Sequence, residues 1–174
     1  MIANAEENSA RLRWGVYLVL IAVAVGNMTG RLLAVNSVDK IGLEKRLQGR
    51  EQLQRPFLSA NDRSRWMTIR ALVEHGTYEI DAIFGQPTWD SIDVVQHRGR
   101  DGELHLYSSK PPLLATLLAG EYWVIHRITG WTLGDHPYEI GRFMLFTLNV
   151  LPMVLMFVLV ARLVERFGAT DWGR

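Results

Sequence analysis

The chain has 174 residues, of which 48% are hydrophobic and 21% charged, and its formal net charge at pH 7 is +1. The absence of cysteine excludes a disulfide framework and a thiolate metal site, and the nearly neutral charge argues against nucleic-acid binding. The apolar residues are gathered into long blocks, which is typical of membrane proteins. We therefore predict an all-α polytopic membrane protein with about three transmembrane helices and an extracytoplasmic loop of short helices and a β-hairpin.

The first apolar block follows a stub, residues 1–13, which contains Arg11 and Arg13. Residues 14–35 are long enough to form a first transmembrane helix, since about 20 residues cross the hydrocarbon core. A cleaved signal peptide is the alternative, but the run is long for one and its exits lack a small-x-small pattern. The basic stub predicts a cytoplasmic N-terminus, so that residues 36–110 form an extracytoplasmic loop domain.

Two helices are predicted in the first half of this loop. Residues 38–55 have loosely helical apolar spacing and are expected to lie on the membrane surface. A second helix is expected from Asp62 to about His75, because Ser59 and Asn61 are good caps and Gly76 follows. Its apolar stripe is predicted to consist of Trp66, Ile69 and Val73.

The second half of the loop has strand signals. A short strand is expected over residues 77–80, and residues 92–97 and 103–107 are expected to form a β-hairpin around the Asp101-Gly102 pair. His97 and His105 would then face each other. A metal between them would need a third ligand, so a structural or solvated role is preferred and no metal or cofactor is expected.

The segment Tyr107-Ser-Ser-Lys-Pro-Pro-Leu-Leu114 marks the entrance to a helix, because proline is well suited to the first helical positions. Residues 111–131 are predicted as a second transmembrane helix, 132–141 as a cytoplasmic connection, 142–163 as a third span and 164–174 as a tail. Three basic residues follow the last apolar block, which ends at Ala161: Arg162, Arg166 and Arg174. Their charge favours two spans, which would leave the tail in the cytoplasm.

Asp62 is the candidate for chemistry. It stands four residues before Trp66 and seven before Ile69, so we expect it at the end of the buried stripe, partly desolvated. A carboxylate tuned by burial and a nearby cation is suited to act as a general base. The alternative is a first-turn acid favoured by the helix dipole or paired with Arg63 or Arg65.

These motifs, over residues 14–165, resemble the N-terminal part of GT-C glycosyltransferases such as lipid A aminoarabinose transferases and protein O-mannosyltransferases. Asp62 matches the acidic residue early in the first outer loop, Lys110 a Lys-Pro-Pro-Leu motif, and Arg142 a recurring arginine. The chain departs from the family where Asp62 is followed by Arg63 instead of a second acid, and in its small number of spans. It resembles the first part of such an enzyme or a truncated relative.

The resemblance implies inverting sugar transfer from a polyprenyl-phosphate donor to an unidentified acceptor at the outer face of the inner, cytoplasmic membrane. Asp62 would take the acceptor proton, and Lys110, with Arg63 or Arg65, would bind the donor phosphate. Membrane lipid would be the other partner. Two alternatives remain: Lys110 as an interfacial anchor, and the whole chain as a non-catalytic membrane subunit or scaffold whose loop binds a partner.

Two further groups of polar residues each have two alternative roles. Asp81, Asp90 and Asp93 are either a second acidic centre near the donor or part of a solvated loop. Glu121 and His126, in the second block, are either functional intramembrane groups or residues that face neighbouring helices or the interface.

Overall fold

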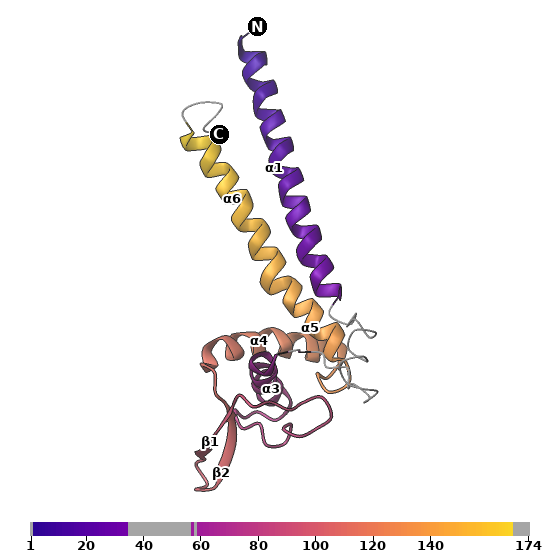
Figure 1. Cartoon of the computed structure of the whole chain (residues 1–174), viewed down its shortest axis with the longest axis vertical. Coiled ribbons are helices and arrows are strands. Elements are labelled where there is room, and N and C mark those ends of the chain that lie inside the picture. Colours follow the sequence, from indigo (N-terminus) through magenta and orange to yellow (C-terminus); the bar gives the residue numbers. More distant parts are fainter. Residues whose placement is uncertain (1, 35–56, 58, 169–174) are drawn as a thin grey trace, which may run out of the picture. The chain divides into compact units, whose positions relative to one another are not determined.

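The computed structural model describes residues 2–34, 57 and 59–168, with side chains from residue 8 onward (Figure 1). It divides into two compact units: unit 1 contains residues 1–35 and 145–174, and unit 2 contains residues 36–144. Each unit is described by itself. The surface helix expected over residues 38–55 lies outside the described residues.

Unit 1 is built from helices at the two ends of the chain. Helix α1 (Ile2–Leu33) lies beside α6 (Leu151–Phe167), which follows the π-helical turn η2 (Phe146–Val150). The Arg13 guanidinium, near the start of α1, donates to both carboxylate oxygens of Glu165, near the end of α6, at 2.8 and 3.0 Å. The hydroxyl of Tyr17 donates to the same carboxylate at 3.1 Å. The two helices therefore run antiparallel, as Figure 1 shows.

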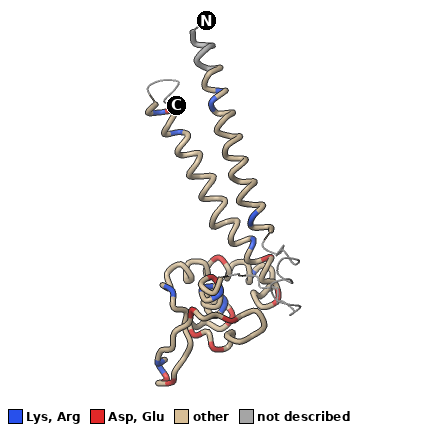
Figure 2. Tube along the Cα trace, in the orientation of Figure 1, with Lys and Arg blue, Asp and Glu red and all other residues tan. Residues whose placement is uncertain are grey.

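Two of the described helices are long and apolar enough to cross a membrane: Asn8–Leu33, and the continuous helix Pro137–Phe167 that includes η2. The first contains residues 14–33 of the predicted span 14–35, and the second contains all of the predicted span 142–163. Their charged residues gather towards their ends (Figure 2). The π-helical turn precedes Pro152, which lacks the N–H that a regular α-helix would use at this point.

The middle block is not among the described helices that are long and apolar enough to cross a membrane. It forms α4 (Pro112–Thr129), which packs against another helix of unit 2. If α1 and α6 both cross a membrane, their antiparallel arrangement returns the chain to its starting side. A crossing by α4 would instead make α6 run parallel to α1. The antiparallel packing of α1 and α6 is compatible with the two-span alternative that the basic tail indicates, and the three spans that the motif resemblance suggests stay a prediction.

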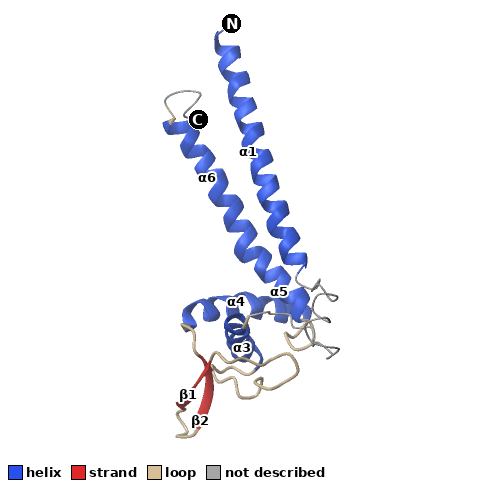
Figure 3. Ribbon diagram, in the orientation of Figure 1, coloured by secondary structure: helices blue, strands red, loops and turns tan. Residues whose placement is uncertain are grey.

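The described residues of unit 2 form a pair of packed helices and a hairpin, followed by a short third helix (Figure 3). Helix α3 (Ala60–Glu74) packs on α4, and strands β1 (Val94–Arg98) and β2 (Leu104–Ser108) pair antiparallel, followed by α5 (Pro137–Leu145). The ends of α3 agree with the prediction: the Ser59 side chain accepts from the Asp62 N–H, and Gly76 has φ +71°. Helix α4 begins at its predicted proline entrance and ends at Gly130, whose φ is +73°.

The core of unit 2 forms where α3, α4 and the following loops meet. Ile69 is 1% exposed and Trp66 6%, which confirms two members of the predicted stripe, whereas Val73 is half-buried. The ring of Phe57 stacks on Trp66 with 4.3 Å between centroids. Other fully or nearly fully buried apolar side chains are Met67, Ile80, Ile83, Trp89, Ala115, Tyr122, Leu133, Ile140 and Met144.

A carboxylate at the end of α3 joins this core. Glu74 accepts hydrogen bonds from Arg70 Nε at 2.8 Å, from the Tyr122 hydroxyl of α4 at 2.6 Å, and from the backbone N–H of Leu133 at 3.0 Å. Burial and the hydrogen bond to Glu74 raise the pKa of Tyr122 above its ordinary value. One nearly buried acid therefore links α3, α4 and the loop that leads to α5.

Two predicted elements differ from the structure. Residues 77–80 are not a strand: Ile80 N–H donates to the Leu106 carbonyl at 2.9 Å, but the Leu106 N–H donates to the Asp81 side chain, which stops the ladder after one bond. The connection predicted at 132–141 includes the first residues of α5. The hairpin is confirmed: β1 begins two residues and ends one residue later than predicted, and β2 begins and ends one residue later.

The burial of Ile69 generates a stability prediction. Ile69→Asp places an unpaired carboxylate in the core and is expected to lower the free energy of unfolding of unit 2 by about 2–4 kcal/mol. Ile92→Asp is the matched control, because Ile92 is 92% exposed. Thermal unfolding and limited proteolysis in detergent measure the difference. Equal resistance of both variants would show that α3 does not form the core.

The antiparallel helices of unit 1 generate a topology prediction. Since the chain contains no cysteine, single exposed cysteines can be introduced by Asn8→Cys, Glu103→Cys, Asp135→Cys and Arg166→Cys. We expect an impermeant maleimide to label positions 103 and 135 from one side of the membrane, and positions 8 and 166 from the other. Labelling after vesicle disruption is the control for reactivity. Position 135 on the same side as position 8 would establish a third crossing.

Candidate functional site

Asp62 lies in the first turn of α3, and its side chain is 56% exposed. Its carboxylate accepts a hydrogen bond from the Ser59 hydroxyl at 2.6 Å, while its N–H donates to the Ser59 oxygen at 3.0 Å. Ser59 is thus the N-cap of α3, and its hydroxyl in turn donates to the Asp62 carboxylate. The predicted desolvation of Asp62 is therefore wrong, because the buried stripe of α3 begins one turn later. The carboxylate also lies 3.9 Å from Nη1 of Arg65.

Arg63 and Arg65, both predicted as phosphate ligands, lie in different surroundings. The Arg63 side chain is buried, with Nε 2.6 Å from the Asp90 carbonyl and Nη1 2.9 Å from the Phe57 carbonyl. It thereby ties α3 to two loop segments. The Arg65 side chain is 38% exposed and lines a surface pocket. The structure thus supports a structural role for Arg63 and leaves Arg65 accessible to a ligand.

The pocket beside Arg65 has a volume of about 260 Å³ and also contains Lys110, so two predicted site residues from distant parts of the chain meet here. Its wall combines hydroxyls and small apolar groups: Thr68, Tyr78, Tyr107, Ser108, Pro111, Pro112 and Ala115. The N-terminus of α4 stands at this wall. Two cations and the positive end of a helix dipole make the pocket suitable for an anion such as a phosphate.

Lys110 is held in position from two sides. Its Nζ lies 3.2 Å from Oδ1 of Asp93, and its N–H donates to the Ser108 hydroxyl at 3.2 Å. Ser64 of α3 contacts the Ser108 hydroxyl and donates to the Asp93 carbonyl at 2.7 Å. The link from α3 through Ser64 therefore fixes the segment that carries Lys110.

Of the two alternatives for Asp81, Asp90 and Asp93, a shared acidic centre is not formed. Asp93 pairs with Lys110, Asp90 lies 3.6 Å from Nε of Arg63, and Asp81 binds the ring of His105 and the N–H of Leu106. Each carboxylate has a different partner, so these residues do not share a site. Their roles follow from the folding of the loop, which their spacing in the sequence does not reveal.

Helix α4 has two apolar faces. On one face, Ala115, Ala119 and Tyr122 are buried against the rest of unit 2. The opposite side has a stripe of exposed large residues at helical spacing, namely Leu113, Leu117, Val124 and Ile128, which are between 47% and 79% exposed. An exposed apolar stripe that starts beside an anion pocket is typical of a surface that meets lipid headgroups and chains.

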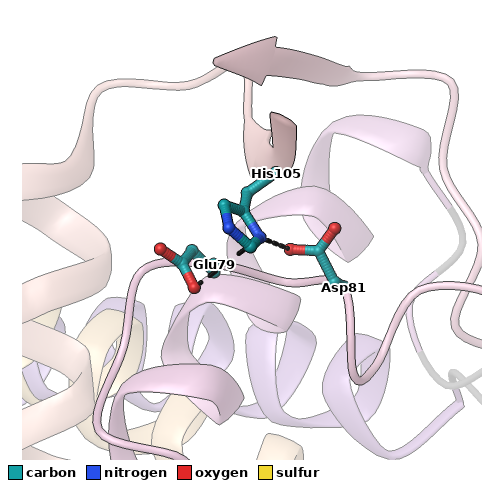
Figure 4. Close-up of side chains that lie close together, drawn as sticks. All are labelled: Glu79, Asp81 and His105. Atoms are coloured by element: carbon teal, nitrogen blue, oxygen red, sulfur yellow. Dashed lines mark hydrogen bonds and ion pairs between the residues drawn. The ribbon is translucent and has the colours of Figure 1, made fainter. Parts of the chain in front are cut away.

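A second cluster surrounds His105 on β2 (Figure 4). Its Nδ1 lies 3.2 Å from Asp81 and 3.8 Å from Glu79, and its Nε2 lies 2.8 Å from Asp101 in the hairpin turn. The hydrogen bond to Asp101 raises the pKa of His105 above its ordinary value, and the same bond lowers the pKa of Asp101. Burial and a hydrogen bond to Glu79 raise the pKa of Tyr107.

His97 does lie opposite His105 in the register of the hairpin, as predicted. The carboxylates beside His105 come from the segment after α3 (Glu79 and Asp81) and from the hairpin turn (Asp101). The pairing of the two histidines does not predict these contacts. The signal available in the sequence is the alternation Glu79-Ile-Asp81 around a buried isoleucine, which places both acids away from the core.

No protein-family model, curated protein or solved structure matches this chain.

The contrast between the two arginines generates a prediction. Arg63→Met removes the donor to the buried carbonyl of Phe57 and to the part-buried carbonyl of Asp90, and is expected to lower the free energy of unfolding by about 1–3 kcal/mol. Arg65→Met removes an exposed cation, and its effect should stay within about 0.5 kcal/mol. Chemical denaturation in detergent compares them. Equal stability of the two variants would contradict a structural role for Arg63.

Proposed function

We propose that this protein takes part in sugar transfer from a polyprenyl-phosphate donor at a membrane surface, with the pocket of Arg65 and Lys110 as the site for the donor phosphate. The observation that carries the proposal is that these two cations, 45 positions apart in the sequence, line one pocket at the N-terminus of α4. Charge-assisted hydrogen bonds from arginine and lysine are the usual means of binding phosphate oxygens.

The polyprenyl part of the donor has a matching surface. The exposed stripe of α4 begins at Leu113, three residues after Lys110, and continues for four turns to Ile128. A lipid whose phosphate occupies the pocket would place its hydrocarbon chain along this stripe or in the adjoining membrane. The two candidate spans, Asn8–Leu33 and Pro137–Phe167, support a membrane location.

Asp62 is the residue proposed to accept the proton of the acceptor hydroxyl. Its carboxylate is exposed and lies 3.9 Å from Arg65, so it borders the pocket without lining it. Proton transfer to a positioned base typically contributes a factor of about 10² to 10⁴ in rate. In this arrangement Arg65 connects the phosphate site to the base.

Binding is tested with the full chain in detergent, using undecaprenyl phosphate as ligand and undecaprenol as the matched control without phosphate. Lys110→Ala is expected to weaken undecaprenyl phosphate binding roughly 10- to 100-fold through loss of a charge-assisted contact. Lys110→Arg should retain most of the affinity, and undecaprenol binding should not respond to either change. Equal affinity for the phosphate and the alcohol would exclude this pocket as the phosphate site.

Transfer is tested in membranes with a panel of labelled undecaprenyl-phosphate sugars at matched expression. Asp62→Asn should retain phosphate binding and reduce transfer by about two to four orders of magnitude. The double variant Asn61→Asp/Asp62→Asn tests whether a carboxylate at the neighbouring position restores sugar transfer. Intact binding without transfer by the unaltered chain would instead support the non-catalytic scaffold, which binds lipid and holds a partner.

A further inference from the structure

The cluster around His105 combines the atoms that a metal ion uses. One imidazole nitrogen and one carboxylate oxygen each from Glu79 and Asp81 all lie within 4.8 Å of one another. Figure 4 shows the two carboxylates and the ring converging from separate segments, the turn after α3 and strand β2. All three side chains are partly exposed, at 35%, 43% and 21% for Glu79, Asp81 and His105. An ion can therefore enter from solvent.

The ring of His105 is oriented as in a metal site. Its Nε2 lies 2.8 Å from Asp101, while its Nδ1 is the atom directed at Asp81 and Glu79. A histidine that ligates a metal through one nitrogen usually donates its other N–H to a carboxylate, which fixes the tautomer and the ring orientation. With the N–H directed to Asp101, the lone pair of Nδ1 faces the two remaining carboxylates.

We propose that Glu79, Asp81 and His105 bind one divalent transition-metal ion, best matched by Zn²⁺, with Asp101 as the positioning residue that orients the imidazole. Zn²⁺ bonds of about 2.0–2.2 Å in a tetrahedron place neighbouring ligand atoms about 3.3–3.6 Å apart. The contacts of Nδ1 with Asp81 and Glu79, at 3.2 and 3.8 Å, bracket that separation. Three protein ligands leave the fourth position to water.

The type of ligand narrows the choice of ion. Imidazole nitrogen is a good ligand for zinc and a poor one for Mg²⁺ or Ca²⁺, which take oxygen ligands. Three carboxylates around a single imidazole also produce an excess of negative charge that a divalent cation offsets. We therefore expect Zn²⁺ to bind much more tightly than Mg²⁺.

The ion would join the hairpin to the segment after α3. Between these segments, the Ile80 N–H donates to the Leu106 carbonyl, and side-chain bonds link Asp81 with Leu106 and Glu79 with Tyr107. A metal bound across Asp81 and His105 adds a strong link at the same place. Gly99 accommodates the ring, since a Cβ at this position would lie 2.7 Å from Cδ2 of His105.

A proton is the rival occupant of Nδ1. An imidazolium would bridge Asp101 and Asp81 with two charge-assisted hydrogen bonds, and these contacts would then form a surface ion-pair network without a metal. The two occupants differ in one measurable respect, because only the metal site takes up Zn²⁺ with a fixed stoichiometry through these side chains.

The test is calorimetric titration of ZnCl₂ into the full chain, purified in detergent without a polyhistidine tag and freed of metal with a chelator. We expect one Zn²⁺ per chain with micromolar or tighter affinity, and a melting temperature that rises on binding. Asp81→Asn and His105→Gln should each weaken binding roughly tenfold or more. Asp81→Asn retains an oxygen that can accept from the Leu106 N–H, so it tests the ligand with little disturbance of the fold.

The control is His97→Gln, which removes the exposed histidine opposite His105 and should change the affinity less than twofold. Asp101→Asn should weaken binding by roughly 10- to 100-fold if it orients the ring. Co²⁺ in place of Zn²⁺ should give visible absorption that is lost in His105→Gln. No uptake at 100 µM ZnCl₂ (roughly 100-fold above the expected dissociation constant), or equal uptake by the Asp81→Asn and unaltered chains, would overturn the proposal.

Discussion

The carboxylate of Glu74 is the group on which the arrangement of unit 2 depends. It receives hydrogen bonds from Arg70 on its own helix, from Tyr122 in the middle of α4, and from the backbone of Leu133 beyond α4. A charge that is 12% exposed is unfavourable unless donors surround it, so these three bonds have to form together. They set the position of α4 on α3, and the pocket between Arg65 of α3 and the first turn of α4 exists only in that position.

Strand β2 connects the two sites of this unit. His105 near its start lies in the cluster with Glu79 and Asp81, Ser108 at its end leads to Lys110, and Tyr107 between them lines the pocket of Arg65 and Lys110 and also donates to Glu79. Alternation along a strand places His105 and Tyr107 on one face and Ser108 on the other, and the Tyr107 side chain borders both sites. A short hairpin can thus contribute to two sites at once, and an ion that fixes one end of β2 would also restrict the segment that holds Lys110.

The sequence predicted those parts of the fold that depend on local signals. Ser59 and Gly76 delimit α3, the proline pair starts α4, and the Asp101-Gly102 turn marks the hairpin, because caps and turns act within a few residues. The neighbourhoods of Arg63 and Arg65 were not predictable, since two positions on a helix point in nearly opposite directions and only the tertiary structure decides which is buried. Asp62 was placed on the buried stripe, but its side chain is exposed, whereas the side chain of the next residue, Arg63, is buried. The average hydropathy of the middle block also did not show that α4 has one buried face and one exposed apolar face, whereas the spacing of its residues does.

Both cations of the pocket have a carboxylate beside them, and this bears on how an anion would bind. Lys110 contacts Asp93 at 3.2 Å, and Arg65 lies 3.9 Å from Asp62. Partly exposed ion pairs contribute little to stability, so replacing a carboxylate by a phosphate oxygen as the partner of the cation costs little free energy. The carboxylates hold the two cations in place while the pocket contains water, and they neutralise charge that would otherwise attract any anion. Selectivity for a lipid phosphate would then come from the apolar stripe of α4, because a free phosphate gains nothing from that surface whereas a polyprenyl chain does.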